Sequence, residues 1–145
     1  MDFLRYLEGI RTDALTNIFK CFTWFGEEII VLAILCCLYW CFNKRLAYRI
    51  CFSYFLSGLA IQVLKITFRI PRPWILDKEF TPVPSAIKTA TGYSFPSGHT
   101  QSATALFGTL FTNTKKRWKQ IIYVIIIIGV AFSRKYLGVH TPKDV

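Results

Sequence analysis

Residues 46–64 read LAYRICFSYFLSGLAIQVL, an apolar run whose strongly polar members are Arg49 and Gln62. A transmembrane helix needs about 20 consecutive, predominantly apolar residues. The run is therefore long enough to cross a bilayer, and it predicts a membrane-spanning helix.

Three further apolar runs predict three more membrane helices. They cover residues 29–42, 100–112 and 121–132. The run at 100–112 is rich in Ala, Gly, Ser and Thr, whose small side chains allow close helix contact inside a bundle. Four such segments in 145 residues leave too little polar surface to cover a soluble core. We therefore expect an all-α, polytopic membrane helix bundle with about four transmembrane helices.

The N-terminal segment 1–20 mixes charged residues with apolar residues at roughly helical spacing. This pattern is typical of an amphipathic helix at the membrane interface, and equally of an amphipathic helix packed on protein. It does not fit a signal peptide, because acidic residues occur early and no cleavage site of small residues follows an apolar core.

Composition excludes several classes of protein. The chain is 53% hydrophobic and 18% charged, whereas soluble domains average about 25% charged residues. The net charge of +10 could indicate a nucleic-acid binder, but such proteins keep their basic residues on one water-facing surface. Here apolar runs separate the basic clusters, so we expect a membrane protein and no nucleic-acid partner. The five cysteines form no CxxC pair, so no metal site is predicted.

The basic residues also predict the orientation in the membrane. The short connections 43–49 and 113–119 together carry seven Lys and Arg and no acid. Positively charged short loops stay in the cytoplasm. Residues 65–99 and 133–145 are then outside.

Three polar clusters fall at the predicted outer ends of these helices. They are Lys65 with Arg72-Pro73, then Pro96-Ser97-Gly98-His99, and then Ser133-Arg134 with His140 and Asp144. The basic connections that set the topology do not include these clusters, yet the topology places all three on one side of the membrane.

The residue types in these clusters suit a phosphate group. Lys65, Arg72 and Arg134 would repel one another unless they shared an anion, and Arg matches the geometry of phosphate oxygens. Ser97 and Gly98 precede a predicted helix, and helix N-termini bind phosphate through free amide groups. Histidine serves as nucleophile or as general acid. If the stretch after His140 is helical, Asp144 reaches its ring from the next turn.

The clusters resemble the motifs of the type 2 phosphatidic acid phosphatase superfamily, which read Lys-x6-Arg-Pro, Pro-Ser-Gly-His and Ser-Arg-x5-His-x3-Asp. All three match here without a gap, at Lys65–Pro73, Pro96–His99 and Ser133–Asp144. The resemblance covers roughly residues 20–145. Members continue into another membrane helix beginning near that Asp. We therefore expect residues 1–145 to be a single membrane phosphatase domain that is incomplete at its C-terminus.

The resemblance implies metal-independent hydrolysis of a lipid phosphate or diphosphate, with no cofactor. The substrate would be undecaprenyl diphosphate, phosphatidic acid or phosphatidylglycerol phosphate. His140 would attack phosphorus and form a phosphohistidine, His99 would protonate the leaving oxygen, and Asp144 would orient His140. The phosphate-binding residues would be Lys65, Arg72, Ser97, Gly98 and Arg134.

Two questions stay open at this level. The chain could instead be a non-catalytic membrane subunit or lipid-headgroup-binding protein that retains the anion site. A homo-oligomer is also compatible with the sequence.

The predicted location is the cell membrane, as a multi-pass protein with its active site on the extracytoplasmic face. Glu27 and Glu28 are interpreted as interface acids in contact with water rather than as headgroup ligands.

Overall fold

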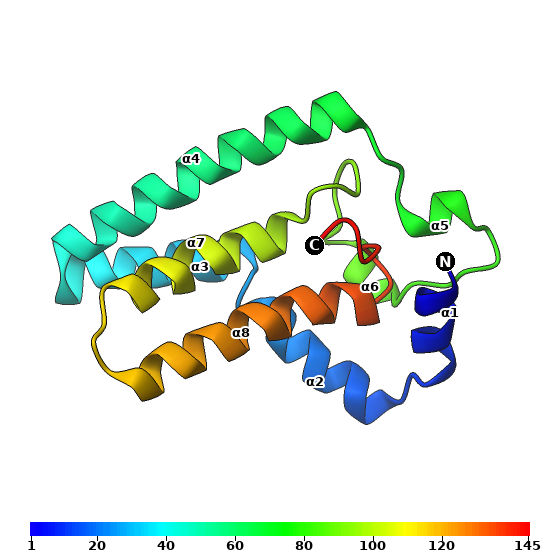
Figure 1. Cartoon of the computed structure of the whole chain (residues 1–145), viewed down its shortest axis with the longest axis horizontal. Coiled ribbons are helices and arrows are strands. Elements are labelled where there is room, and N and C mark those ends of the chain that lie inside the picture. Colours follow the sequence, from blue (N-terminus) through cyan, green and yellow to red (C-terminus); the bar gives the residue numbers. More distant parts are fainter.

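The computed structural model describes residues 1–145 and contains helices and turns but no strands. In chain order the elements are α1 (Asp2–Gly9), α2 (Asp13–Trp24), α3 (Glu28–Cys37), η1 (Leu38–Phe42, a π-helix), α4 (Lys44–Phe68), α5 (Pro73–Leu76), α6 (Pro84–Ile87), α7 (Gly98–Thr112) and α8 (Arg117–Tyr136). Figure 1 shows an elongated bundle in which α3, α4, α7 and α8 run along the long axis. The prediction of an all-helical protein is confirmed.

Each predicted apolar run lies in a long-axis helix, and local signals set the ends of these helices. The Asn43 side chain accepts a hydrogen bond from the Leu46 amide at 3.0 Å and so starts α4, as expected of an Asn cap. Arg69 adopts a left-handed conformation (φ 47°) and ends α4. Ser97 caps α7 in the same way that Asn43 caps α4. The fourth run is part of the 20-residue helix α8.

The N-terminal segment differs from the prediction of one amphipathic helix. It forms two helices, because Thr12 adopts an extended conformation and its side chain accepts from the Leu15 amide to begin α2. Leu4 and Leu7 of α1 are buried, and Arg5 makes an ion pair with Asp77 at 2.7 Å. One side of α1 thus packs on protein, while Phe3 and Tyr6 are exposed on its surface.

The centre of the bundle is formed by α3, α4, α7 and α8. Val31, Ile50, Leu106 and Val130, one from each helix, belong to a single buried cluster. Helix α7 also contributes Ala103, and its small residues bring it close to α4 and α8. The predicted interior position of the 100–112 run is thus confirmed.

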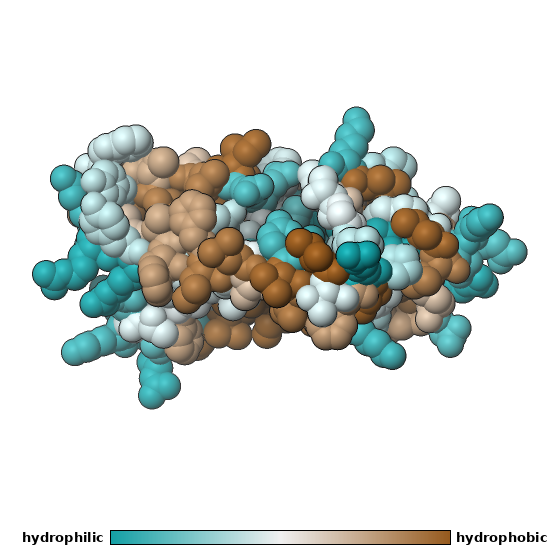
Figure 2. Space-filling view, turned by 90° about the horizontal axis from the view of Figure 1, so that it is seen from above, coloured by the Kyte–Doolittle hydropathy of each residue, from teal (hydrophilic) through white to brown (hydrophobic).

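The outer face of α4 is apolar and unpartnered within the chain. Phe52, Leu59 and Val63 are 71%, 67% and 65% exposed, and Figure 2 shows apolar residues over the middle of this face with hydrophilic residues at both ends. By length and composition, the stretch Lys44–Leu76 is able to cross a membrane. The pair α2 and α3–η1, bent by 48°, passes the same test when its two parts are combined. The predicted number of four spans is not established by this criterion.

The two basic connections meet at one end of the bundle. The Arg49 guanidinium donates to the Asn113 side-chain oxygen at 2.5 Å and joins them. In Figure 1 both connections lie at the left, whereas α5, α6 and the C-terminus lie toward the right. The structure therefore separates the basic connections from the three motif clusters, as the charge pattern predicts.

Close packing of α2 on α8 depends on Gly129. A Cβ atom at this position would lie 2.3 Å from the Phe22 ring. We expect Gly129→Ala to lower the free energy of unfolding by about 1–3 kcal/mol, the usual cost of overpacking. A fall in the thermal unfolding midpoint of the detergent-solubilised protein would show it. The matched control is Gly108→Ala, whose Cβ would meet only Thr104 at 4.0 Å. Equal midpoints for the two variants would contradict the prediction.

Candidate active site

A cavity of about 310 Å³ opens between α3, α4, α7 and α8 at the end of the bundle that carries the motif clusters. Six of the eight predicted site residues line it: Lys65, Arg72, Gly98, His99, Arg134 and His140. They come from α4, the loop after it, the start of α7, the end of α8 and the turn that follows α8. Residues that are up to 75 positions apart in the sequence, Lys65 and His140, thus share one cavity.

Arg134 is fully buried and is positioned by α2. One terminal nitrogen donates to the Thr23 hydroxyl at 3.3 Å, and that hydroxyl pairs with Ser133 at 2.9 Å. The other two guanidinium nitrogens, Nε and Nη2, are buried without a hydrogen-bond partner. A buried, unpaired charged donor is costly, so this fork suits an anion in the cavity.

Arg72 is bound mainly by backbone carbonyls. Its guanidinium donates to Gly92 O at 3.0 Å, Thr91 O at 2.7 Å and Val139 O at 2.9 Å. One nitrogen also lies 3.0 Å from His140 Nε2. Arg72 therefore fastens the 89–92 loop and the turn after α8 together, a positioning function that the motif alone did not indicate.

His140 is 2% exposed, and its ring presents Nε2 to Arg72. Because Arg72 can only donate, Nε2 carries the lone pair and the ring proton is on Nδ1. Burial, and next the positive charge of Arg72, lower the pKa of His140 well below its usual value. The ring is thus neutral at neutral pH, which is the protonation state that a nucleophilic imidazole requires.

Asp144 lies beside the cavity and does not reach His140 in the expected way. Residues 137–145 form turns, not a helix, so the i+4 geometry does not arise. The carboxylate accepts from the Ser94 hydroxyl at 2.6 Å and from the Thr141 amide at 2.7 Å. Its Oδ1 and His140 Nδ1 are both buried without a partner. Ser94 had no motif signal and was missed.

Ser97 is also absent from the cavity lining. Its hydroxyl caps α7 through the Thr100 amide at 3.5 Å, and its amide donates to Asp144 O at 2.9 Å. Gly98 and His99 follow it directly and do line the cavity. Ser97 therefore orients the start of α7 from beside the cavity.

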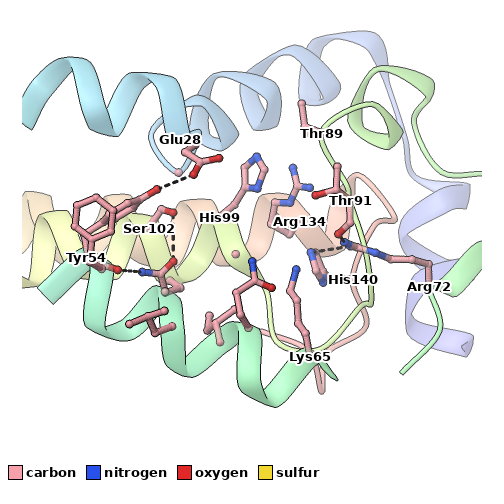
Figure 3. A pocket seen from close by; sticks show the side chains of 18 residues that line it. Glu28, Tyr54, Lys65, Arg72, Thr89, Thr91, His99, Ser102, Arg134 and His140 are labelled. Atoms are coloured by element: carbon pink, nitrogen blue, oxygen red, sulfur yellow. Dashed lines mark hydrogen bonds between the residues drawn. The ribbon is translucent and has the colours of Figure 1, made fainter. Parts of the chain in front are cut away.

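His99 points into the cavity, where Figure 3 shows it between Glu28 and Arg134. Its Nε2 is buried without a partner. Gly26 packs on its backbone so closely that a Cβ at Gly26 would lie 2.5 Å from His99 O. No sequence signal distinguished Gly26 from other glycines.

The charges around the cavity are unbalanced. Three basic side chains and two imidazoles face one carboxylate, Glu28. Glu28 lines the cavity and is also exposed, so it combines the predicted contact with water with a position beside the cations. No three His, Cys, Asp or Glu side chains come together as a metal-ligand group.

Comparison with known families gives this arrangement a context. A family model described as the PAP2 superfamily matches residues 46–145, a range that includes all eight predicted site residues. The chain belongs to the PAP2 superfamily. The resemblance to type 2 phosphatidic acid phosphatases is thereby confirmed.

Individual relatives of the chain are also named as phosphatases. Sphingosine-1-phosphate phosphatase 2 from Mus musculus is 29% identical over 127 residues, covering 83% of this chain and 34% of the relative. An undecaprenyl-diphosphatase from Sulfolobus acidocaldarius is 42% identical over 55 residues, or 38% of this chain and 26% of the relative. The crystal structure of LpxE from Aquifex aeolicus superposes with a TM-score of 0.84 at 26% identity. The match covers 99% of this chain and 84% of that one. The chain spans about a third of the length of the curated relatives it matches.

The unpartnered nitrogens of Arg134 lead to a prediction about anion binding. We expect orthovanadate, a phosphate mimic, to raise the thermal unfolding midpoint, because a ligand that binds the folded state stabilises it. At 100 times its Kd the gain is about 2.7 kcal/mol. Arg134→Met should abolish this shift.

The control is Lys78→Met, which removes an exposed basic residue outside the cavity. If Arg134→Met fails to fold, Lys65→Met tests the same cavity from α4. A vanadate shift of wild-type size in the cavity variants would refute the assignment.

Proposed function

We propose that this PAP2 chain is an integral membrane phosphatase that hydrolyses a lipid phosphate or diphosphate through a phosphohistidine intermediate. One observation carries the proposal: Lys65, Arg72, Arg134 and two histidines, from separate segments, converge on one cavity. Fixed cations stabilise the charge that spreads over the oxygens of a transferring phosphoryl group. They can neutralise that charge without a metal ion.

In the proposed reaction, the lone pair of His140 Nε2 attacks the terminal phosphorus and the bond from that phosphorus to the leaving oxygen breaks. His99, protonated at Nε2, gives its proton to that oxygen, and the product is the lipid alcohol from a phosphate monoester or the lipid monophosphate from a diphosphate. Water then attacks the phosphohistidine, with His99 taking up a proton, and inorganic phosphate leaves. The orientation of Nε2 toward Arg72, and thus toward the cations, supports this assignment.

Asp144 is proposed to complete the nucleophile. Its Oδ1 and His140 Nδ1 are the two buried unpartnered atoms of this turn, and a hydrogen bond between them would satisfy both. Such bonds are often long in ligand-free sites and shorten in the substrate complex. Ser94 and the Thr141 amide keep the carboxylate in place.

The membrane arrangement is part of the proposal. The helices α3–η1, α4, α7 and α8 would cross the bilayer, with the basic connections in the cytoplasm and the cavity at the extracytoplasmic face. The exposed apolar face of α4 supports contact with lipid. The named activities of the relatives, on sphingosine 1-phosphate and on undecaprenyl diphosphate, support a lipid phosphate as substrate. Phosphatidic acid and phosphatidylglycerol phosphate are further candidate substrates.

We expect His140→Ala to abolish phosphate release from a panel of lipid phosphates assayed in detergent and EDTA. The loss should be at least about 10³-fold, because removal of a nucleophile leaves only binding and electrostatic catalysis. The wild-type protein should also accumulate an acid-labile phosphoenzyme when it is quenched during turnover.

Thr141→Ala is the control, since it changes the neighbouring side chain but keeps the Thr141 amide bond to Asp144. Turnover by His140→Ala above a few percent of wild type would remove His140 from this role.

A second candidate function is lipid-headgroup binding without catalysis. The observation in its favour is that His140 Nε2 is engaged by Arg72 and that Asp144 makes no hydrogen bond to His140. A protein of this kind would retain vanadate binding and release no phosphate from any member of the panel.

Sidedness is tested by cysteine labelling. In a background without the five native cysteines, which are exposed or half-buried, we expect Ser85→Cys to react with an impermeant thiol reagent in intact cells. Lys115→Cys should react only after permeabilisation, because its connection is one of the two basic ones. Both positions are exposed in the structure. The opposite labelling pattern would overturn the orientation.

A further inference from the structure

The cavity has a second group of polar side chains that the proposed reaction does not use. Glu28 of α3, Tyr54 of α4 and Ser102 of α7 line it together. The Tyr54 hydroxyl donates to Glu28 Oε1 at 3.4 Å. In Figure 3 these three residues lie on the far side of His99 from Arg72. The cavity thus has a cationic half, and an acceptor half defined by Glu28, Tyr54 and Ser102.

The acceptor half has hydrogen-bonding capacity to spare. The 3.4 Å bond from Tyr54 is long, and an ionised carboxylate can accept about four hydrogen bonds. Glu28 is also the one carboxylate among the cavity-lining residues. Tyr54 and Ser102 are 8% and 6% exposed, whereas Glu28 is exposed, so its carboxylate is open to a partner that enters the cavity, and a charge-assisted hydrogen bond to it is stronger than a neutral one.

Helix geometry places this half deeper in the bundle than the cations. Tyr54 precedes Lys65 by 11 residues on α4, which corresponds to about 16 Å of helix. Ser102 follows His99 by almost one turn on α7. Both steps lead away from the end that carries the motif clusters. The acceptor half therefore begins less than one helix turn beyond His99 on α7, and a lipid whose phosphate lies among the cations, with its chain directed toward the bilayer core, passes along it.

We propose that Glu28, with Tyr54 and Ser102, selects lipid phosphates that carry a hydrogen-bond donor, an ammonium or a hydroxyl, on the carbons next to the phosphoester. This inference rests on the proposed function and narrows its substrate class to lipid phosphates with such a donor beside the phosphoester. A carboxylate attracts an ammonium group and accepts from a hydroxyl. The ester oxygens of a diacylglycerol phosphate are acceptors only, and a polyprenyl chain offers no donor, so neither can pair with Glu28.

A matched pair of substrates tests the selection. Sphinganine 1-phosphate and octadecyl phosphate share a phosphate monoester and an 18-carbon chain, but only the first has an ammonium and a hydroxyl beside the phosphate. We expect wild-type kcat/KM to favour sphinganine 1-phosphate. Glu28→Gln should lower its kcat/KM about 10-fold or more, as for loss of a charge-assisted hydrogen bond. Its kcat/KM for octadecyl phosphate should change by less than about 2-fold.

Two further variants sharpen the test. Tyr54→Phe should lower selectivity in the same direction by a smaller factor, since it removes a neutral hydroxyl. Glu27→Gln is the matched control, because it neutralises the adjacent carboxylate, which does not line the cavity. Equal losses on both substrates with Glu28→Gln, or no loss on either, would overturn the inference.

Binding separates this inference from the proposed function. The affinity of both lipids for the wild-type protein and for Glu28→Gln is measured in detergent, independently of turnover. If neither lipid is hydrolysed but wild type prefers sphinganine 1-phosphate and Glu28→Gln does not, the proposed function fails and the selection stands. If both lipids are hydrolysed and bound without a preference that depends on Glu28, the selection fails and the proposed function stands.

Discussion

The mutual repulsion of three cations at one end of an apolar bundle is the constraint on which the remaining structure depends. Lys65, Arg72 and Arg134 line one cavity, and two of them are nearly or fully buried. Gathering like charges away from water costs free energy unless each is hydrogen-bonded or paired. Backbone carbonyls meet that requirement for Arg72, whereas Arg134 has one hydroxyl partner and keeps two nitrogens unpartnered in a cavity lined by a single carboxylate, Glu28.

The two arginines meet the requirement differently, and this difference suggests different tasks. Arg72 has its donors on three backbone carbonyls and on His140, so its position is fixed by the loops it connects. Arg134 is anchored at one nitrogen, by Thr23, and keeps two nitrogens unpartnered. Arg134 is therefore the better direct ligand for an oxyanion, whereas Arg72 holds the ring of His140, the proposed nucleophile. A lysine could not replace either one, because it lacks the planar fork that serves several acceptors at once.

Much of this molecule could be predicted from its sequence, since apolar runs and motif spacing are local signals. The helix containing residues 46–64, the interior position of 100–112 and the convergence of six site residues follow from them. Contacts across the fold left no such signal. Ser94 belongs to none of the three motifs and lies 50 positions from Asp144 in the sequence, yet its hydroxyl donates to the Asp144 carboxylate. The sequence left open whether the stretch after His140 is helical; it forms turns, and Arg72 binds the carbonyl of Val139 there.

The bend between α2 and α3 joins the two halves of the cavity. The two segments meet at 48°, and residues 23–28 form the elbow. Thr23 contacts Arg134, Gly26 packs on the backbone of His99, and Glu28 enters the acceptor half. The elbow thus connects Thr23, which holds Arg134 in the cationic half, to Glu28 in the acceptor half, so the positions of the two halves depend on one segment of the chain.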